Sequence, residues 1–226
     1  MITRYLFTVI FILTSSLANS QSNFTPIDTT SSGFCRSNLF KEYTLKFNLI
    51  NKNIVSTTSA QKTIVKEIYN KIQEDFLDKI NADNFICEDH LNVYLNGLLQ
   101  EVLEKNRIKD NYKILLSKDG NANAYNTGDG TVVIHFGLFL TLENEDELVF
   151  VIAHEIGHQY LNHVKTEIEN FAKIATSEEV INKTKEIRNK KYGKATMASD
   201  FLKTINYQNY ANRRKKEFAA DSIGVA

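Results

Sequence analysis

Apolar residues recur every four positions in the first half of the chain. Between residues 61 and 80, five apolar side chains follow this spacing: Ile64, Ile68, Ile72, Phe76 and Ile80. Residues 88–104 repeat the pattern at Leu91, Leu95, Leu98 and Val102. A period near 3.6 residues gives each segment one apolar face. The pattern predicts two amphipathic helices.

The middle of the chain changes to short runs of β-branched and aliphatic residues. Residues 112–116 and 131–136 have this composition, which favours strands, and glycine-containing turns follow the first run and precede the second. Residues 123–125 lie between the two turns. We expect a small sheet in this region.

Charged residues dominate the last third of the chain, which has only a thin apolar seam. Residues 165–192 show helical spacing up to Gly193, and a final helix runs from Phe201 toward Glu217. Together these segments predict a helical hairpin. The expected fold class is α+β, mostly helical, with one small sheet.

The first twenty residues have the composition of a signal peptide. Arg4 precedes an apolar core that is too short to span a bilayer, and Ala18 and Ser20 are the small residues that a signal peptidase recognises. We expect cleavage near Ser20 and export to the periplasm or the extracellular space. An uncleaved membrane anchor is the alternative.

Residues 21–58 are rich in Ser, Thr and Asn, and we expect a mostly irregular arm on a domain that spans residues 59–226. Export would allow Cys35 and Cys87 to form a disulfide, because disulfides persist in oxidising compartments. A bond between these cysteines closes a loop of about fifty residues, which stabilises the fold by roughly 4 kcal/mol on the chain-entropy model. Two unpaired thiols are the alternative.

The charge balance excludes one class of partner. The chain has 27 basic and 27 acidic residues, so it lacks the positive excess typical of proteins that bind nucleic acid. Local basic runs at residues 183–194 and 213–216 are interpreted as solvated helix faces. Contact of these runs with an anionic membrane surface is the alternative.

The clearest chemical signal is His154-Glu155-Ile-Gly-His158, which lies inside an apolar helical pattern. Asn144 has the position of an N-cap, and the acidic turn after it suits the helix dipole. At about 100° per residue, His154 and His158 share one helix face. Two imidazoles one turn apart are typical zinc ligands, and Glu155 can take a proton from water on the metal. The alternative, two core histidines, leaves Glu155 unexplained.

A zinc site needs a third protein ligand. On a continuing helix His163 points roughly opposite to His154, so we do not expect it to bind the metal. Among the later acidic residues, only Glu217 is followed four positions on by another carboxylate, that of Asp221. Such an aspartate can orient a ligating histidine. A solvent-facing acidic pair is the alternative, although the residues between the two carboxylates are apolar.

These residues together resemble the HtpX-like and CAAX prenyl protease family of zinc metallopeptidases, in the gluzincin clan. The resemblance covers about residues 60–226. It implies a zincin-like fold and one zinc ion per chain. The implied roles are ligands at His154, His158 and Glu217, a catalytic base at Glu155, and a partner for a ligating histidine at Asp221.

The resemblance also includes Asn123, Ala124 and Tyr125, which are similar to the edge strand of that family. An edge strand beside the cleft can pair with an extended polypeptide substrate and hold its main chain. An ordinary surface loop is the alternative.

We therefore expect an exported zinc metalloendopeptidase that hydrolyses peptide bonds and, as the resemblance implies, acts in protein quality control. A catalytically impaired remnant that binds polypeptides through the same cleft is the alternative. The chain ends five residues after Asp221, so we expect a domain that is short at its C-terminus and carries its third ligand on a terminal turn.

Overall fold

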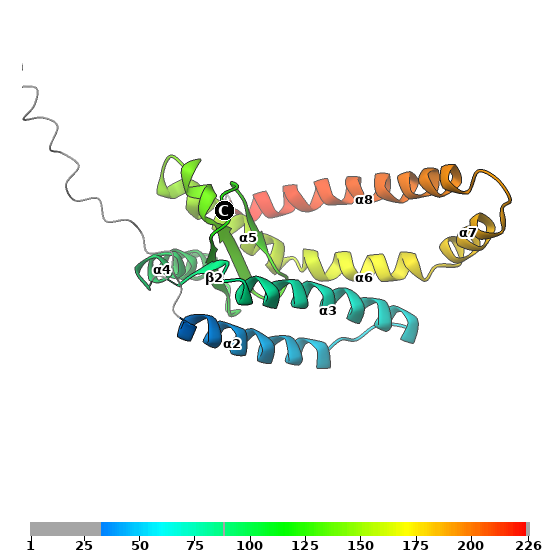
Figure 1. The fold of residues 1–226 in the computed structure, drawn as a ribbon. Coiled ribbons are helices and arrows are strands. Elements are labelled where there is room, and N and C mark those ends of the chain that lie inside the picture. Colours follow the sequence, from blue (N-terminus) through cyan, green and yellow to red (C-terminus); the bar gives the residue numbers. More distant parts are fainter. Residues whose placement is uncertain (1–32, 88, 225–226) are drawn as a thin grey trace, which may run out of the picture.

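The computed structural model describes residues 33–87 and 89–224, except for the side chains of residues 89 and 206–211. The predicted signal peptide and residues 21–32 lie outside this range. Most of the described chain is helical, and a four-stranded sheet lies near the centre, which confirms the expected fold class (Figure 1). None of the described helices combines the length and the apolar composition that a membrane span requires.

The helices and strands follow each other in a simple order. They are α2 (Gly33–Lys52), α3 (Ser59–Asn81), β1 (Phe85–Ile86), α4 (Asp89–Lys105), β2 (Lys113–Ser117), β3 (Ala124–Asn126), β4 (Thr131–His135), the 3-10 helix η1 (Phe136–Leu140), α5 (Glu145–Tyr160), α6 (His163–Ala175), α7 (Glu178–Asn189) and α8 (Lys194–Gly224). The strand order is β1-β2-β4-β3. Strands β2 and β4 pair in parallel, whereas β1 and β3 pair antiparallel to their neighbours.

The sheet separates two apolar layers, because successive side chains of a strand point to opposite faces. Ile114 and Ile134 pack with α4 and α5 on one face, where the core includes Leu95, Leu99, Ile152 and Ile156. Leu115 and Val133 pack on the other face with residues of α2 and α3. Helix α5, which carries the histidine motif, is therefore fixed against the sheet along its buried side.

Residues 33–52 are helical, so the expectation of a mostly irregular arm is wrong for this part of the chain. Leu39, Tyr43 and Phe47 recur at four-residue spacing and are buried against α3 and the sheet. Exposed apolar residues of the same helix, such as Leu45 and Leu49, do not follow this spacing and obscure the helical pattern in the sequence. Helix α2 is therefore part of the folded body.

Cys35 and Cys87 form a disulfide bond. Cys35 lies on α2 and Cys87 follows β1, and both pack with the apolar layer on the α2–α3 side of the sheet. The bond joins segments that are 52 residues apart in the sequence, and it closes the N-terminal helical pair onto the edge of the sheet.

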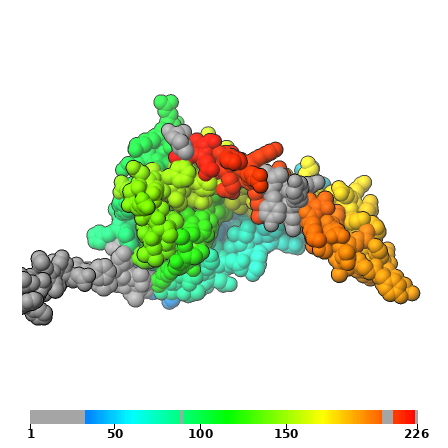
Figure 2. Space-filling view, turned by 90° about the horizontal axis from the view of Figure 1, so that it is seen from above, coloured from blue at the N-terminus to red at the C-terminus, as the bar shows by residue number. Residues whose placement is uncertain are grey.

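Helices α6, α7 and α8 form the expected hairpin, which projects from the body (Figures 1 and 2). The segment at 165–192 is two helices and not one, because Ser177 caps a new helix and its hydroxyl accepts a hydrogen bond from the Val180 N–H at 3.3 Å. Helix α6 packs against α3 through Ile168 and Ala172, which holds one arm of the hairpin. Helix α8 returns to α5.

The disulfide provides a test of how firmly α2 is joined to the body. Replacing both cysteines, Cys35→Ser with Cys87→Ser, is expected to lower the free energy of unfolding by about 2–4 kcal/mol, since the unfolded chain regains the freedom of a long loop. Urea denaturation of both proteins measures the difference. Adding reductant to the wild-type protein should reproduce the loss, and an equal stability of all three samples would contradict the role of the bond.

Candidate metal centre

Helix α5 begins as its sequence predicts. The Asn144 side chain accepts a hydrogen bond from the Glu147 N–H at 3.0 Å, and the Glu147 carboxylate accepts one from the Glu143 N–H at 2.8 Å. The cap fixes the first turn of α5, and the buried face of Leu148, Ile152 and Ile156 fixes its rotation against the sheet. His154 and His158 consequently share the face that is turned away from the core.

The end of α5 differs from the sequence prediction. The helix stops at Tyr160, and Asn162 adopts a left-handed conformation with φ of 54°, so the chain turns before α6. His163 therefore does not point away from the motif. Its Nδ1 lies 3.0 Å from Nδ1 of His158 and makes a hydrogen bond with it.

Helix α8 crosses α5 in close contact at Gly157. A Cβ atom at this position would lie 3.1 Å from both the Cα and the carbonyl oxygen of Ala220, and 3.4 Å from Cβ of Ile223. Only a glycine lets the two backbones approach this closely without displacement. The approach brings the turn of α8 that contains Glu217 and Asp221 over the two histidines.

Three candidate ligand atoms converge at this crossing. The Nε2 atoms of His154 and His158 are 3.1 Å apart, and the Glu217 Oε2 lies 3.6 Å from the first and 3.5 Å from the second. Zinc bonds of 2.0–2.1 Å at tetrahedral angles separate neighbouring ligand atoms by roughly 3.3–3.5 Å. The three sides of the observed triangle are close to this value, so the residues present fit a tetrahedral ion with one position open.

Hydrogen bonds orient both imidazoles toward this point. The His154 Nδ1–H donates to the Asp221 Oδ1 at 2.9 Å, which leaves the lone pair of Nε2 directed at Glu217. His158 presents its own Nε2 lone pair when its Nδ1–H donates to His163. Two lone pairs and one carboxylate then face each other, an arrangement that a dication stabilises.

Burial helps to keep two of these histidines neutral. Desolvation is the main cause that lowers the pKa of His158, and it also lowers the pKa of His163, where the charges of His158 and Lys216 act in the same direction. A lowered pKa means that the imidazole is uncharged at neutral pH, as a metal ligand must be. The Lys216 ammonium donates to the His163 carbonyl oxygen at 3.1 Å and ties α8 to α6.

Glu155 is buried beside the histidines and is only 9% exposed. Desolvation raises its pKa, whereas the charge of His154 and hydrogen bonds from the backbone and side chain of Asn126 lower it. A carboxylate in such surroundings takes up a proton more readily than an exposed one. Sequence reasoning missed the contact with Asn126, the last residue of β3.

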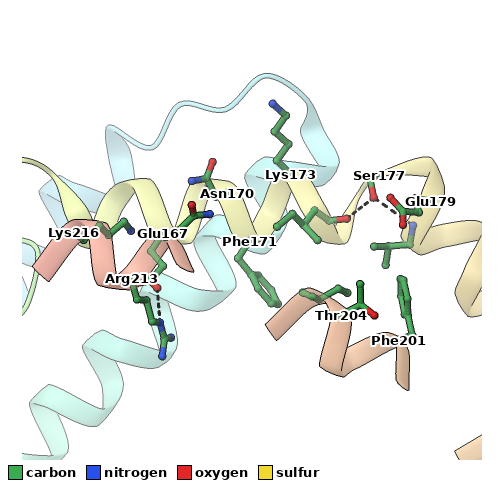
Figure 3. A pocket seen from close by; sticks show the side chains of 14 residues that line it. Glu167, Asn170, Phe171, Lys173, Ser177, Glu179, Phe201, Thr204, Arg213 and Lys216 are labelled. Atoms are coloured by element: carbon green, nitrogen blue, oxygen red, sulfur yellow. Dashed lines mark hydrogen bonds and ion pairs between the residues drawn. The ribbon is translucent and has the colours of Figure 1, made fainter. Parts of the chain in front are cut away.

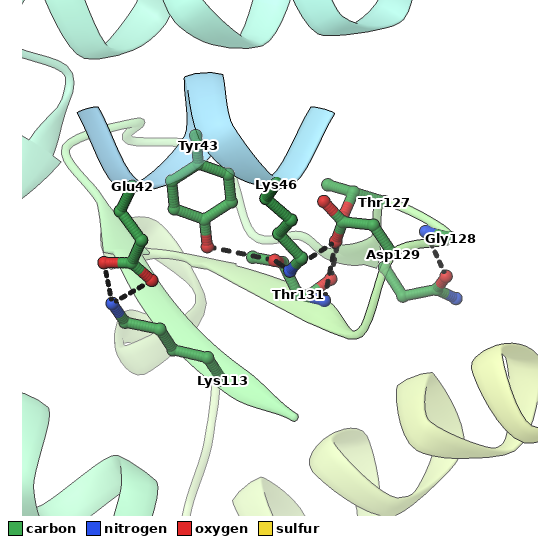
Figure 4. A network of polar contacts seen from close by, with 9 residues as sticks. Glu42, Tyr43, Lys46, Lys113, Thr127, Gly128, Asp129 and Thr131 are labelled. Carbon is green, nitrogen blue, oxygen red and sulfur yellow. Dashed lines mark hydrogen bonds and ion pairs between the residues drawn. The ribbon is translucent and has the colours of Figure 1, made fainter. Parts of the chain in front are cut away.

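A polar network holds the turn after Asn126 in place (Figure 4). The Tyr43 hydroxyl shares a hydrogen bond of 2.9 Å with the Thr131 hydroxyl, and Lys46 donates to the same oxygen at 2.9 Å and pairs with Asp129 at 3.3 Å. The Gly128 N–H donates to the Asn126 side-chain oxygen at 2.9 Å. Helix α2 thereby supports the residue that contacts Glu155.

The predicted substrate strand is an edge strand. Ala124 and Tyr125 belong to β3, which pairs only with β4 among the described strands, and Asn123 accepts a hydrogen bond from the His135 N–H just before it. In an antiparallel ladder the direction of the backbone groups alternates. The backbone groups of Asn123 face β4, so the backbone groups of Ala124 face outward. Asn126, at the end of the same strand, contacts Glu155.

A His-Glu-x-x-His helix on a mixed sheet, with a glutamate of a later helix close to both histidines, is the arrangement of the zincin-like metallopeptidase fold. The model of peptidase family M48 matches residues 89–226, and the chain belongs to this family of zinc metallopeptidases. The resemblance to the HtpX-like and CAAX prenyl proteases is thus confirmed at the level of the family.

Curated relatives are proteases. The chain is 31% identical over 163 residues to a putative beta-barrel assembly-enhancing protease of Vibrio cholerae, an alignment that covers 65% of this chain and 31% of the relative. It is 33% identical over 81 residues to the beta-barrel assembly-enhancing protease of Escherichia coli K12, and this alignment covers 35% of this chain and 17% of the relative. It is 40% identical over 78 residues to a CAAX prenyl protease 1 homolog of Arabidopsis thaliana, covering 30% and 18%. The chain thus spans less than a third of the length of each.

The close crossing of α5 and α8 can be tested at Gly157. We expect Gly157→Ala to weaken zinc binding about tenfold, because displacing α8 by a few tenths of an ångström moves Glu217 and Asp221 away from the histidines. Competition with a zinc chelator of known affinity measures the change.

Gly97 is the matched control for this substitution. It lies within α4, and a Cβ atom at this position would have no other atom within 4 Å beyond its own helix backbone and chain neighbours. Gly97→Ala is expected to raise the free energy of unfolding by about 0.5–1 kcal/mol and to leave zinc affinity unchanged, since alanine is the better helix former. Equal zinc affinities of the two variants would show that the crossing does not position the ligands.

Proposed function

We propose that this chain is an exported zinc-dependent endopeptidase with His154, His158 and Glu217 as metal ligands. The observation that carries the proposal is the convergence of these three ligand atoms beside a buried glutamate and a free strand edge. Membership of a peptidase family supports a polypeptide as the substrate.

The substrate main chain is proposed to pair with β3. Backbone N–H and C=O groups of Ala124 point outward, and an extended peptide can add to them as a further strand. Side chains of the substrate do not take part in this pairing, so it grips polypeptides of many sequences. Tyr125 is held by Lys79, whose ammonium donates to its hydroxyl at 3.2 Å, and this contact keeps the strand in place.

Glu155 is proposed as the general base. A zinc ion held by His154, His158 and Glu217 would supply Lewis-acid chemistry, making the attacking water more acidic and the scissile carbonyl more electrophilic. Glu155 takes a proton from the attacking water as the water oxygen bonds to the carbonyl carbon. Glu155 then gives that proton to the leaving nitrogen as the C–N bond breaks. Asn126 fixes the carboxylate, and Asp221 fixes the ring of His154 through the whole cycle.

Unfolded or misassembled envelope proteins are the proposed substrates. The relatives from Vibrio cholerae and Escherichia coli are named for enhancing β-barrel assembly, and the predicted signal peptide would place this chain in an exported compartment. The disulfide between Cys35 and Cys87 supports an oxidising location.

Cleavage of unfolded casein by the zinc-loaded protein tests the proposed function. We expect Glu155→Gln to reduce the rate at least about a hundredfold while one zinc ion per chain is retained, because the substitution removes the base and keeps all three ligands. Gel-based cleavage assays and metal analysis of the same samples measure both quantities.

Two controls give the experiment its direction. A chelator should abolish wild-type cleavage, and restored zinc should recover it. Full activity of Glu155→Gln would exclude Glu155 as the base, and a wild-type protein that holds zinc but never cleaves would favour the polypeptide-binding remnant.

A further inference from the structure

The hairpin of α6, α7 and α8 has apolar side chains that its own packing does not bury. Helix α7 contains no buried residue, and from Lys173 to Ile205 no described side chain is buried. Yet six apolar residues of the hairpin face one another across it: Phe171, Ile174, Val180, Ile187, Phe201 and Ile205. Exposed apolar surface that lines a concave region is typical of a binding site.

These side chains line a groove that leads toward the metal centre. One cavity of about 410 Å³ is almost wholly apolar and lies between the three helices. A second cavity of about 540 Å³ shares Phe171 and Phe201 with the first and extends to Glu167, Arg213 and Lys216 (Figure 3). We call the two connected cavities the hairpin groove.

The end of the hairpin groove near the candidate metal centre carries charged side chains, which we call its near end. At the near end the Arg213 Nε pairs with the Glu167 Oε1 at 3.0 Å across α8 and α6, and Lys216 directly precedes the proposed ligand Glu217. The rim carries charges of both signs, including Lys173 and Glu179, so it offers no uniform field for a polyanion. An apolar floor with a mixed polar rim fits an extended polypeptide with apolar side chains.

We propose that the hairpin groove is a second binding site for the polypeptide substrate, which holds an apolar segment at a distance from the scissile bond. This inference rests on the proposed endopeptidase function. Phe201 lies sixteen residues before Glu217 on α8, a distance of about 24 Å at the helical rise. An extended chain covers that distance with about seven residues. The groove therefore selects unfolded substrates that expose an apolar cluster about seven residues from the cleavage site.

A substitution that fills the apolar cavity tests whether the hairpin groove binds a polypeptide or is only a region of loose packing. Ala198 lines the apolar cavity, and Ala198→Phe places an aromatic ring inside it. The probe is fluorescein-labelled β-casein, and the zinc-loaded Glu155→Gln protein binds it without cleaving it. Anisotropy is expected to report at least a fivefold weaker affinity after Ala198→Phe is added. Because binding is measured in this background, failure of the proposed proteolysis does not affect the result.

Two further variants serve as controls for the Ala198→Phe substitution. Ala60→Phe adds the same ring to an exposed position of α3 and is expected to leave the affinity unchanged. Ile174→Ser removes part of the apolar lining without filling the cavity and is expected to weaken binding as Ala198→Phe does. Thermal melting monitored by circular dichroism shows that each variant is folded.

In the active protein, Ala198→Phe is expected to raise KM for casein about fivefold with kcat unchanged. A six-residue peptide is too short to reach from the metal centre to Phe201, so its cleavage should not change. Unaltered casein binding by a folded Ala198→Phe protein would overturn the proposal. So would sedimentation equilibrium showing a wild-type dimer that Ala198→Phe dissociates, because a second copy would then occupy the groove.

Discussion

The close crossing of α5 and α8 is the contact on which the candidate centre depends. Two histidines on one helix are not a complete metal site, and the proposed third ligand, Glu217, comes from a segment almost sixty residues later. Gly157 lies between the two histidines and against Ala220, so the position that allows close backbone contact belongs to the motif itself. The same contact places Asp221 Oδ1 at 2.9 Å from His154 Nδ1. The packing of α8 on α5 thus brings in both the proposed third ligand and the carboxylate that hydrogen-bonds to a proposed histidine ligand.

A second set of contacts joins the centre to the rest of the molecule. Asn126 reaches Glu155 from the end of the edge strand, and the turn behind it is held by Tyr43 and Lys46 of α2. Helix α2 is in turn joined to the sheet edge by the disulfide. The N-terminal helix thus contributes to the position of the proposed base through the turn after Asn126.

Sequence patterns that involve neighbouring residues predict much of the candidate site. The spacing of His154 and His158 and the cap at Asn144 depend only on helix geometry, and the structure has both. The pairing of Glu217 with the histidines came from its spacing to Asp221 and from family resemblance, since no local rule links distant segments. Helix α2 has no clear helical pattern in the sequence, because exposed leucines occur among its buried residues. The turn at Asn162 has a signal in the sequence, because an asparagine just after the last periodic residue is a known helix stop. A helix that ends there allows His163 to lie beside His158, whereas a continuing helix does not.

Zinc K-edge X-ray absorption of the full chain and of Glu217→Gln shows whether α8 supplies the third ligand of the metal. We expect one zinc ion with two imidazole nitrogens and a carboxylate oxygen at about 2.0–2.1 Å in the wild-type protein. In the variant we expect a changed oxygen shell and a lower zinc occupancy. An identical spectrum and occupancy in both proteins would contradict this expectation, because the third ligand would then not come from α8.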